Sequence, residues 1–256
     1  VALNTVPFVN KDWEWTVGLT FAYNKNEIVE LYDDANEDRG NKWFVGKPPQ
    51  VELLYKYAGV WQTEEIEEAK KYGYTLGDPK VQDVNSNGKY DQEDQFIFNK
   101  IPKFTAGLNT TLKYKDFDLN LYFYSRAGYG QQIGVLTYEA GSSRMNHLDV
   151  DFWTPDNPSK TFPKPIGSNA LPLLTQSDYS YRNLSFLRMK NINLGYTFPG
   201  ELIEKIRANR LRVYLAVDNP FVWTFNQFEG LDPENCYDYG SHRPLTSFVF
   251  GLNVSF

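Results

Sequence analysis

The chain has 256 residues, of which 26 are basic and 32 are acidic, so its formal net charge is −6. This balance excludes a typical nucleic-acid binder, because such proteins carry a basic face. Aromatic residues make up 16% of the chain, a content that suits a large core, an interface or the girdles of a membrane barrel.

The first residues, Val1 to Thr5, contain no basic segment followed by an apolar one, so we do not expect a signal peptide there. They read like the interior of a longer protein. The chain has no run of about 18 apolar residues and therefore encodes no transmembrane helix. Barrel strands escape that criterion, because every second residue of such a strand faces the lumen.

Alternation of apolar and polar residues predicts the first strand. The period of two is strict from Trp13 to Tyr23, which indicates a strand with one apolar face. A turn follows at 24–26, and we expect a returning strand to start within 28–32. A further strand region, interrupted by two prolines, is predicted at 43–61.

A short helix is predicted from Thr63 to Tyr72. Thr63 is the expected cap, three glutamates stand in the first turns, and Lys70 and Lys71 stand in the last turn. These charges match the direction of the helix dipole.

A twelve-residue loop with the spacing of a calcium site follows at 83–94. Side chains with oxygen ligands occupy its first, third and fifth positions, and a glycine occupies the sixth, where the chain must turn sharply. The expected ligands of a structural Ca²⁺ are Asp83, Asn85, Asn87, the Lys89 carbonyl and Asp94, with Asp91 acting through water. Glu93 competes with Asp94 as the closing ligand, and a turn without metal is the alternative.

A hairpin is predicted next. Residues 106–114 and 117–123 each alternate between apolar and polar, and only Lys115 and Asp116 connect them. So short a connection is typical of one rim of a barrel.

Strands are predicted again at 184–198 and 211–217, with a helical turn at 202–206 between them. The turns at 115–116 and 199–200 would lie at one end of the strands, and the long loops 128–184 and 225–245 at the other. Outer-membrane barrels have this asymmetry. We therefore predict an all-β fold, an antiparallel transmembrane β-barrel segment with long extracellular loops and one short helix.

The last predicted strand places every second residue on one apolar face. Its final residue is an aromatic one, which resembles the recognition signal that the insertion machinery of bacterial outer membranes reads. The residues of this expected membrane-insertion signal are Phe248, Phe250, Leu252, Val254 and Phe256.

Several stretches occur together and in a characteristic order. They are Trp15–Val29, Tyr57–Glu65, Asp94–Phe98, Ile101–Leu108, Phe152–Pro158, Leu184–Pro199, Val217–Thr224 and Glu229–Glu234, followed by the last strand. With this set, nearly the whole chain resembles the C-terminal half of SusC/RagA-type TonB-dependent outer-membrane transporters.

The resemblance implies a 22-stranded barrel with an N-terminal plug in the bacterial outer membrane. Residues 1–256 would be the C-terminal part of the barrel, held in outer-membrane lipid, with 83–94 as a cation loop within it. The rest of the barrel, the plug and the segment that contacts the TonB complex would lie elsewhere. A SusD-type lipoprotein would act as a lid, and the cargo would be glycan or peptide. Many family members have aspartate where Asn85 and Asn87 stand here, which predicts a weaker cation site.

Aromatic residues in or next to the long loops are candidates for contact with cargo, because flat rings stack on sugar faces. These residues are Trp153, Tyr179, Tyr181, Trp223, Phe228, Tyr237 and Tyr239. Glycan is favoured over peptide by these rings and by the commonest use of the family. The alternative interpretation is that such rings anchor the packing of the loops or belong to an interfacial girdle, as is expected for Trp13, Trp15 and Tyr196.

No enzymatic motif is present, so we do not expect an enzyme. The two histidines, His147 and His242, stand in different loops, and the chain lacks a zinc-binding helix motif, a nucleophile elbow and a phosphate loop. A glycoside hydrolase with paired carboxylates has no positive support. The remaining alternative is a secreted, Ca²⁺-stabilised, carbohydrate-binding β-sandwich, in which the alternating faces would bury against each other.

Overall fold

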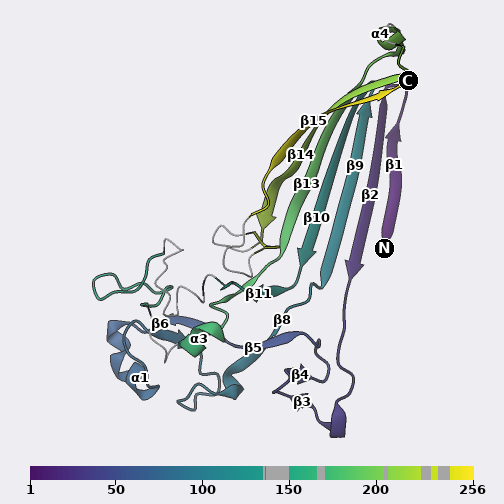
Figure 1. Cartoon of the computed structure of the whole chain (residues 1–256). Helices are drawn as coiled ribbons and strands as arrows, with labels where there is room; N and C mark the ends of the chain where they lie inside the picture. Colours follow the sequence, from purple (N-terminus) through teal and green to yellow (C-terminus); the bar gives the residue numbers. More distant parts are fainter. Residues whose placement is uncertain (135, 137–149, 166–170, 205–206, 226–231, 236–242) are drawn as a thin grey trace.

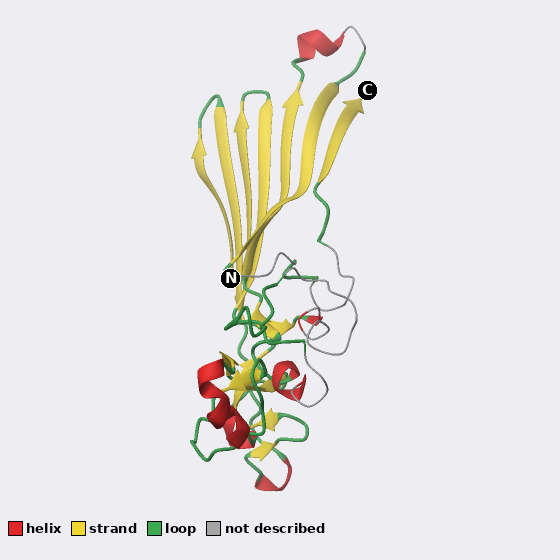
Figure 2. Cartoon of the chain, turned by 90° about the vertical axis from the view of Figure 1, so that its left-hand side faces the viewer, coloured by secondary structure: helices red, strands yellow, loops and turns green. Residues whose placement is uncertain are grey.

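The computed structural model describes residues 1–134, 136, 150–165, 171–204, 207–225, 232–235 and 243–256. One long antiparallel sheet forms one end of the molecule, and loops with short elements form the other (Figure 1; Figure 2). The strands of the sheet are β1 (Ala2–Val9), β2 (Trp13–Tyr23), β9 (Phe104–Tyr114), β10 (Phe117–Ala127), β13 (Phe186–Thr197), β14 (Arg210–Thr224) and β15 (Ser247–Ser255). They pair in this order, so each long strand lies beside the next one along the chain, and β1 and β15 form the two edges of an open sheet.

The connections of the sheet are short at one end and long at the other. At the short end, Lys115 and Asp116 join β9 to β10, and Lys115 takes a positive φ of 52° in this tight turn. The helix α4 (Gly200–Ile203) lies between β13 and β14 at the same end. The long connections 24–103, 128–185 and 225–246 all leave the opposite end, and we call them together the loop region. The predicted asymmetry is confirmed.

One face of the long sheet is apolar. The pairing register continues this face from each strand to the next. A single row of cross-strand neighbours runs through Trp15, Leu112, Leu119, Leu194, Leu215 and Phe250. Leu19, Leu194 and Leu215 on this apolar face are each more than 40% exposed to the surroundings of the chain. Within the described residues every other sheet is two-stranded, and none of them covers this face. The β-sandwich alternative is therefore wrong for the described part of the chain.

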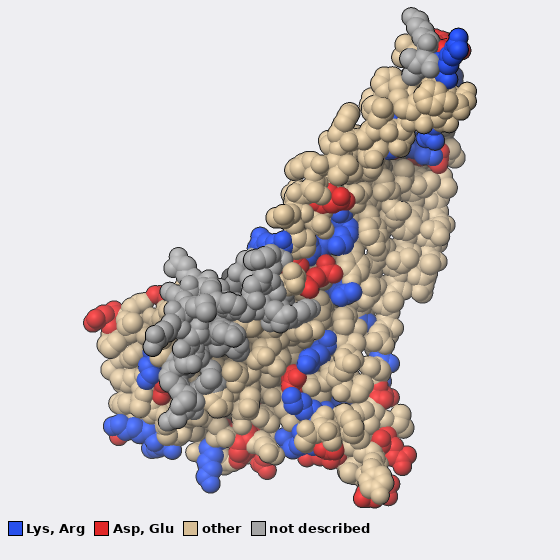
Figure 3. Space-filling model, viewed as in Figure 1, with Lys and Arg blue, Asp and Glu red and all other residues tan. Residues whose placement is uncertain are grey.

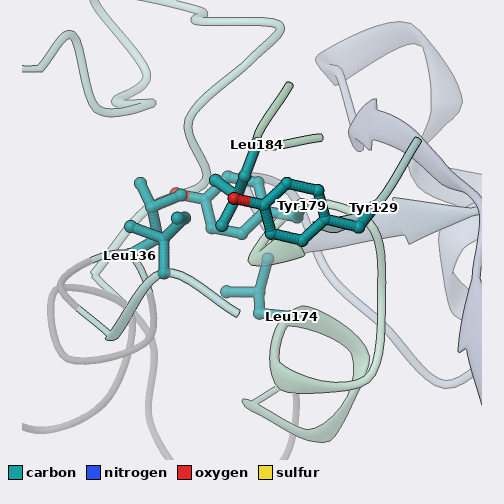
Figure 4. Packing of buried hydrophobic residues seen from close by; sticks show 6 residues of the cluster. Tyr129, Leu136, Leu174, Tyr179 and Leu184 are labelled. Carbon is teal, nitrogen blue, oxygen red and sulfur yellow. The ribbon is translucent and has the colours of Figure 1, made fainter. Parts of the chain in front are cut away.

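Short elements build the loop region. Their bounds are β3 (Glu37–Asp38), β4 (Trp43–Phe44), β5 (Val51–Tyr55), β6 (Tyr57–Val60), α1 (Ile66–Lys71), β7 (Pro79–Val81), β8 (Gln95–Asn99), β11 (Gly130–Gln132), α3 (Leu171–Thr175) and β12 (Tyr181–Asn183), with 3-10 turns at η1 (Tyr32–Asp34), η2 (Thr63–Glu65) and η3 (Gln92–Asp94). Charged side chains gather over this region, whereas the sheet shows few of them (Figure 3). Its interior is a cluster of aromatic and aliphatic side chains that includes Tyr129, Leu174 and Tyr179 (Figure 4).

Three local predictions need correction. The first strand of the sheet, β1, was not expected, because a bulge between Thr5 and Phe8 interrupts its alternation at a proline. No strand returns at 28–32, where Ile28 makes only an isolated bridge to Val45. The helix is present, but it is capped by a reciprocal pair formed by Gln62 and Glu65 and not by Thr63.

Among the described residues, no helix combines the length and the apolarity needed to cross a bilayer.

Candidate functional site

Aromatic rings border the apolar face at both of its ends. At the short-turn end, Trp13 and Tyr114 have ring centroids 4.3 Å apart, and Phe117 and Tyr196 have centroids 4.7 Å apart. At the loop end, the ring of Tyr23 lies 5.3 Å from that of Phe104. These rings form the two girdles that a membrane barrel places at the two interfaces of the bilayer.

The distance between the girdles matches a bilayer. Trp13 and Tyr23 are the first and last of the 11 residues of β2. At a rise of about 3.3 Å per residue they lie roughly 33 Å apart along the strand. A tilt of about 40°, usual in membrane barrels, reduces this to roughly 25 Å, which is the height of their apolar band.

The opposite face of the sheet is polar, and its side chains pair across the strands. Arg212 holds Asp118 with two hydrogen bonds of 2.9 and 2.5 Å and donates a third to Asn193. Lys113 forms an ion pair with Glu14 at 3.1 Å. A sheet with one apolar face and one charged face is suited to separating a bilayer from an aqueous lumen.

A buried ion cluster joins the loop after β14 to this polar face. Arg188 of β13 donates from one guanidinium nitrogen to both carboxylate oxygens of Asp232, at 2.7 and 2.6 Å. Both side chains are at most 3% exposed. Glu234 lies 2.9 Å from Nε of Arg188, an ion pair that lacks hydrogen-bond geometry, so Nε has no hydrogen-bond partner among the described residues. This cluster fixes residues 232–235 against the polar face of the sheet. Sequence reasoning did not find it, because its partners stand 44 residues apart in an alternating strand and a loop.

In the expected cation loop, backbone N–H groups donate hydrogen bonds to side-chain oxygens of the same loop. The N–H of Gly88 donates to Asp83 at 2.8 Å, and the N–H of Asn87 donates to Asn85 at 3.0 Å. Asp94 is 2% exposed and accepts hydrogen bonds from the N–H groups of Val84 and of Asp91, the ninth residue of the loop. Gly88 takes a φ of +80°, so the sharp turn predicted at the sixth position is present.

Two carboxylates of the loop are held in the charged form. Partial desolvation opposes ionisation of Asp83, but hydrogen bonds from Gly88 and from the Tyr72 hydroxyl outweigh it and lower its pKa. Hydrogen bonds from Asn87 and the Glu93 N–H lower the pKa of Asp91. Within the described residues no group of three or more His, Cys, Asp or Glu side chains is placed to hold a metal. The side chains expected as ligands in this loop instead mix carboxylates with amides.

Two of the aromatic candidates are packing residues of the loop region. Trp153 is 5% exposed, and its ring lies against Gly77. Tyr179 is 4% exposed and packs against Tyr57, with ring centroids 5.0 Å apart. Neither ring presents a face to a cargo in this structure, and their burial matches the alternative interpretation of loop anchors.

The other aromatic candidates fall into three groups. Tyr181 is half-buried in β12 and meets Phe98 edge to face at 5.5 Å. Trp223 belongs to β14, is 46% exposed, and stacks beside Phe221 on the apolar face, as a girdle residue does. Phe228, Tyr237 and Tyr239 lie outside the described residues, as do His147 and His242.

The expected insertion signal lies on β15 and just after it. Phe248, Phe250 and Phe256 are each more than 70% exposed, and Leu252 and Val254 are exposed beside them. The register places Phe248, Phe250 and Leu252 opposite apolar residues of β14, which puts them on the apolar face.

Gly77 offers a direct test of the packing around Trp153. Its φ is +79°, and an added Cβ would lie 2.4 Å from the indole ring. We expect Gly77→Ala to destabilise the loop region by about 1–3 kcal/mol, through overpacking and backbone strain. The matched control is Gly73→Ala, which has a similar φ of +83° but no atom within 4 Å of the new Cβ. Thermal denaturation of the two variants should separate them, and equal melting temperatures would contradict the packing described.

No family model matches the chain. TonB-dependent receptor P3 of Formosa agariphila is 29% identical over 292 residues, which cover 100% of this chain and 28% of the receptor. TonB-dependent receptor SusC of Bacteroides thetaiotaomicron is 29% identical over 276 residues, which cover 100% of this chain and 26% of SusC. The chain thus spans less than a third of the length of these curated relatives.

Two solved structures are similar in fold to this chain. A structure of the RagAB peptide transporter superposes with a TM-score of 0.74 at 24% identity, covering 100% of this chain and 28% of that chain. The RagAB peptide importer in its closed-closed state gives a TM-score of 0.71 at 25% identity, covering 100% of this chain and 29% of that chain.

Proposed function

We propose that this chain, a portion of the barrel of a SusC/RagA-type TonB-dependent outer-membrane transporter, forms part of the wall through which cargo is imported across the bacterial outer membrane. The observation that carries the proposal is the sheet itself, apolar and girdled on one face and charged on the other. The relatives are named as receptors and as a peptide transporter, which favours a transport role over an enzymatic one.

The proposed assembly needs partners that complete the wall and supply energy. The edges β1 and β15 expose unpaired strand positions, and further strands of the barrel would pair with them. A plug, the TonB complex and a SusD-type lipoprotein lid over the loop region complete the proposed transporter. The name of the RagAB neighbour joins two components, which supports a partner subunit for the proposed transporter.

Uptake measured in cells tests this proposal. Cells that carry the full-length protein should accumulate cargo only when TonB is present, and the protein should fractionate with the outer membrane. Uptake that persists without TonB, or recovery of the protein in the aqueous fraction, would contradict it.

We propose glycan as the cargo class, with peptide as the second candidate. Half-buried Tyr181 and the polar side chains around it support glycan. The structural likeness to a peptide transporter favours peptide. Competition between oligosaccharides and peptides for uptake would decide between the two classes.

We also propose that the loop 83–94 holds a structural Ca²⁺. Oδ1 of Asp83, Oδ1 of Asn85 and Oδ1 of Asn87 each accept one backbone N–H and keep a second lone pair for a cation. Asp83, Asn85, Asn87, the Lys89 carbonyl and Asp94 would hold the ion, with Asp91 acting through water, and the ion would fix the turn without taking part in chemistry.

Removal of calcium should lower the stability of the loop region. A ligand at 100 times its Kd stabilises the folded state by about 2.7 kcal/mol. We therefore expect a chelator to lower the melting temperature of the purified full-length protein, and added Ca²⁺ to restore it. Asp83→Asn should abolish this response, whereas Asp33→Asn, in an exposed turn outside the loop, should leave it intact. A melting temperature that ignores both chelator and Ca²⁺ would contradict the proposal.

A further inference from the structure

A small hollow lies where β2 and β9 pass into the loop region, at the edge of the apolar face (Figure 1). Its lining contains Tyr23, the last residue of β2, together with Lys25 and Lys103. The ring of Tyr23 lies beside Phe104 in the loop-end girdle, so the hollow lies at the depth of the lipid headgroups. Neither lysine was predicted from the sequence as a site residue.

The lining of the hollow carries an excess of positive charge. Among the described residues that line it, the charged ones are Lys25 and Lys103. Glu27, outside the hollow, forms an ion pair with Lys25 at 3.0 Å, and both side chains of this pair are exposed. Lys103 has no ion pair within the described part of the chain. With Glu27 counted against the two lysines, one positive charge remains to attract an anion.

Amide groups complete the lining and hold the two lysines near each other. The N–H of Asn24 donates to the carbonyl of Lys103 at 2.9 Å, which keeps the segments that carry the lysines side by side. The side chain of Asn99 donates to the carbonyl of Ile101 at 2.6 Å and so fixes the turn before β9. The side-chain amides of Asn24 and Asn26 are further donors in the lining. The hollow therefore presents cations and N–H donors, which together suit an oxyanion.

The hollow is too small to enclose a whole ligand. Its volume is about 50 Å³, whereas pockets that enclose small molecules begin at about 300 Å³. It can therefore receive only one group of a larger ligand. The apolar face continues from Tyr23 toward the middle of β2 through Phe21 and Leu19, which are 42% and 43% exposed. A ligand that fills the hollow with an anionic group and covers this face with acyl chains has the form of a phosphorylated lipid.

A lipid headgroup is favoured over a free anion. The side chain of Lys25 is 65% exposed, so salt screens its attraction for an anion that arrives from solution. A lipid whose acyl chains lie against the apolar face presents its phosphate to the same lysines at a high effective concentration. The contact with the apolar face thus supplies binding that two exposed lysines do not supply alone.

We propose that this hollow binds the phosphate of an outer-membrane lipid, with Lys25 and Lys103 as its cationic contacts and the apolar face of β2 and β9 against its acyl chains. This inference goes beyond the proposed transport function and requires only that the apolar face lies in the outer membrane. The bound lipid would hold the start of the connection 24–103 at the level of the headgroups.

Lipid binding to the purified full-length protein in detergent tests the proposal. The probes are lipid A, which is a phosphorylated glycolipid, the same lipid after removal of its phosphates, and inorganic phosphate, and native mass spectrometry gives the Kd of each. We expect Lys25→Gln and Lys103→Gln each to weaken the binding of lipid A roughly fivefold, and Lys103→Arg to preserve it. Lys71→Gln, which removes an exposed lysine of α1 outside the hollow, is the matched control and should leave the Kd unchanged.

Three results would overturn the inference. Equal binding of lipid A and its dephosphorylated form would show that the acyl chains alone determine binding. Inorganic phosphate that binds as tightly as lipid A would assign the hollow to a free anion, and an unchanged Kd in both glutamine variants would place the headgroup elsewhere. Both lysines are exposed, so the glutamine variants should keep the melting temperature of the original protein. Import that depends on TonB is measured separately on the same variants, which keeps this question distinct from the transport function.

Discussion

Replacement of Arg188 by methionine is expected to release residues 232–235 from the wall of the sheet. Removal of one partner from a buried ion pair leaves an uncompensated charge and typically costs about 3–5 kcal/mol. Asp232 would become that charge, because its carboxylate is 1% exposed and would keep only the bond that its Oδ1 accepts from the N–H of Glu234. Hydrogen exchange of peptides covering 232–235 and β13 in the full-length protein should show the loss of protection.

The double variant Arg188→Met/Asp232→Leu is the informative companion. It removes both charges of the buried pair and leaves only Glu234, whose side chain is 23% exposed, without its partner. We expect the double variant to recover most of the protection, since buried pairs replaced by apolar residues are often no less stable. Lys113→Met breaks the exposed pair with Glu14 and should cost about 1 kcal/mol or less. Equal effects of Arg188→Met and Lys113→Met would show that the buried pair does not anchor this loop.

An arginine on the apolar face should destabilise the barrel strongly, whereas an arginine beside it on the polar face should not. Leu19 lies near the middle of β2 and is 43% exposed on the apolar face. Leu19→Arg would place a charge near the middle of the bilayer, at a cost of about 2–4 kcal/mol. Unfolding by guanidinium in lipid vesicles, followed by tryptophan fluorescence, measures this loss.

Thr20→Arg is the matched control for this substitution. Thr20 is the next residue of the same strand, is also exposed, and faces the polar side, where its neighbour across the strand is Gly107. The two arginines would lie at nearly the same depth on opposite faces. Similar unfolding midpoints for the two variants would contradict the assignment of the apolar face to lipid.

The long sheet could be predicted from the sequence, because its strands share one pattern, the alternation of apolar and polar residues. The alternation from Trp13 to Tyr23 gave β2 with its bounds, and the two residues Lys115 and Asp116 gave the turn of the β9–β10 hairpin. The prediction of strands failed where this alternation is interrupted. The bulge in β1 concealed that strand, and the irregular pairing around Asn219, whose φ is +49°, concealed the extension of β14 to Thr224.

The candidate sites were predicted unevenly for a related reason. The cation loop is a local motif, so its turn at Gly88 followed from spacing alone. Aromatic loop residues carry no such spacing, and only the structure separates buried Tyr179 from half-buried Tyr181. The pairing of Arg188 with Asp232 depends on how distant segments fold together, which no pattern within one segment encodes.

The pairing of β2 with β9 has a consequence for the order in which the protein assembles. These strands match in continuous register from Trp13 to Tyr23, although residues 24–103 separate them. The hairpin of β9 and β10 closes over two residues, and closure over a tether about forty times longer costs roughly 3 kcal/mol more in chain entropy. The pairs β5–β8 and β6–β7 lie within that tether, so their early formation would shorten it. Nucleation is therefore expected at the β9–β10 hairpin, with β2 joining after the inserted segment has folded.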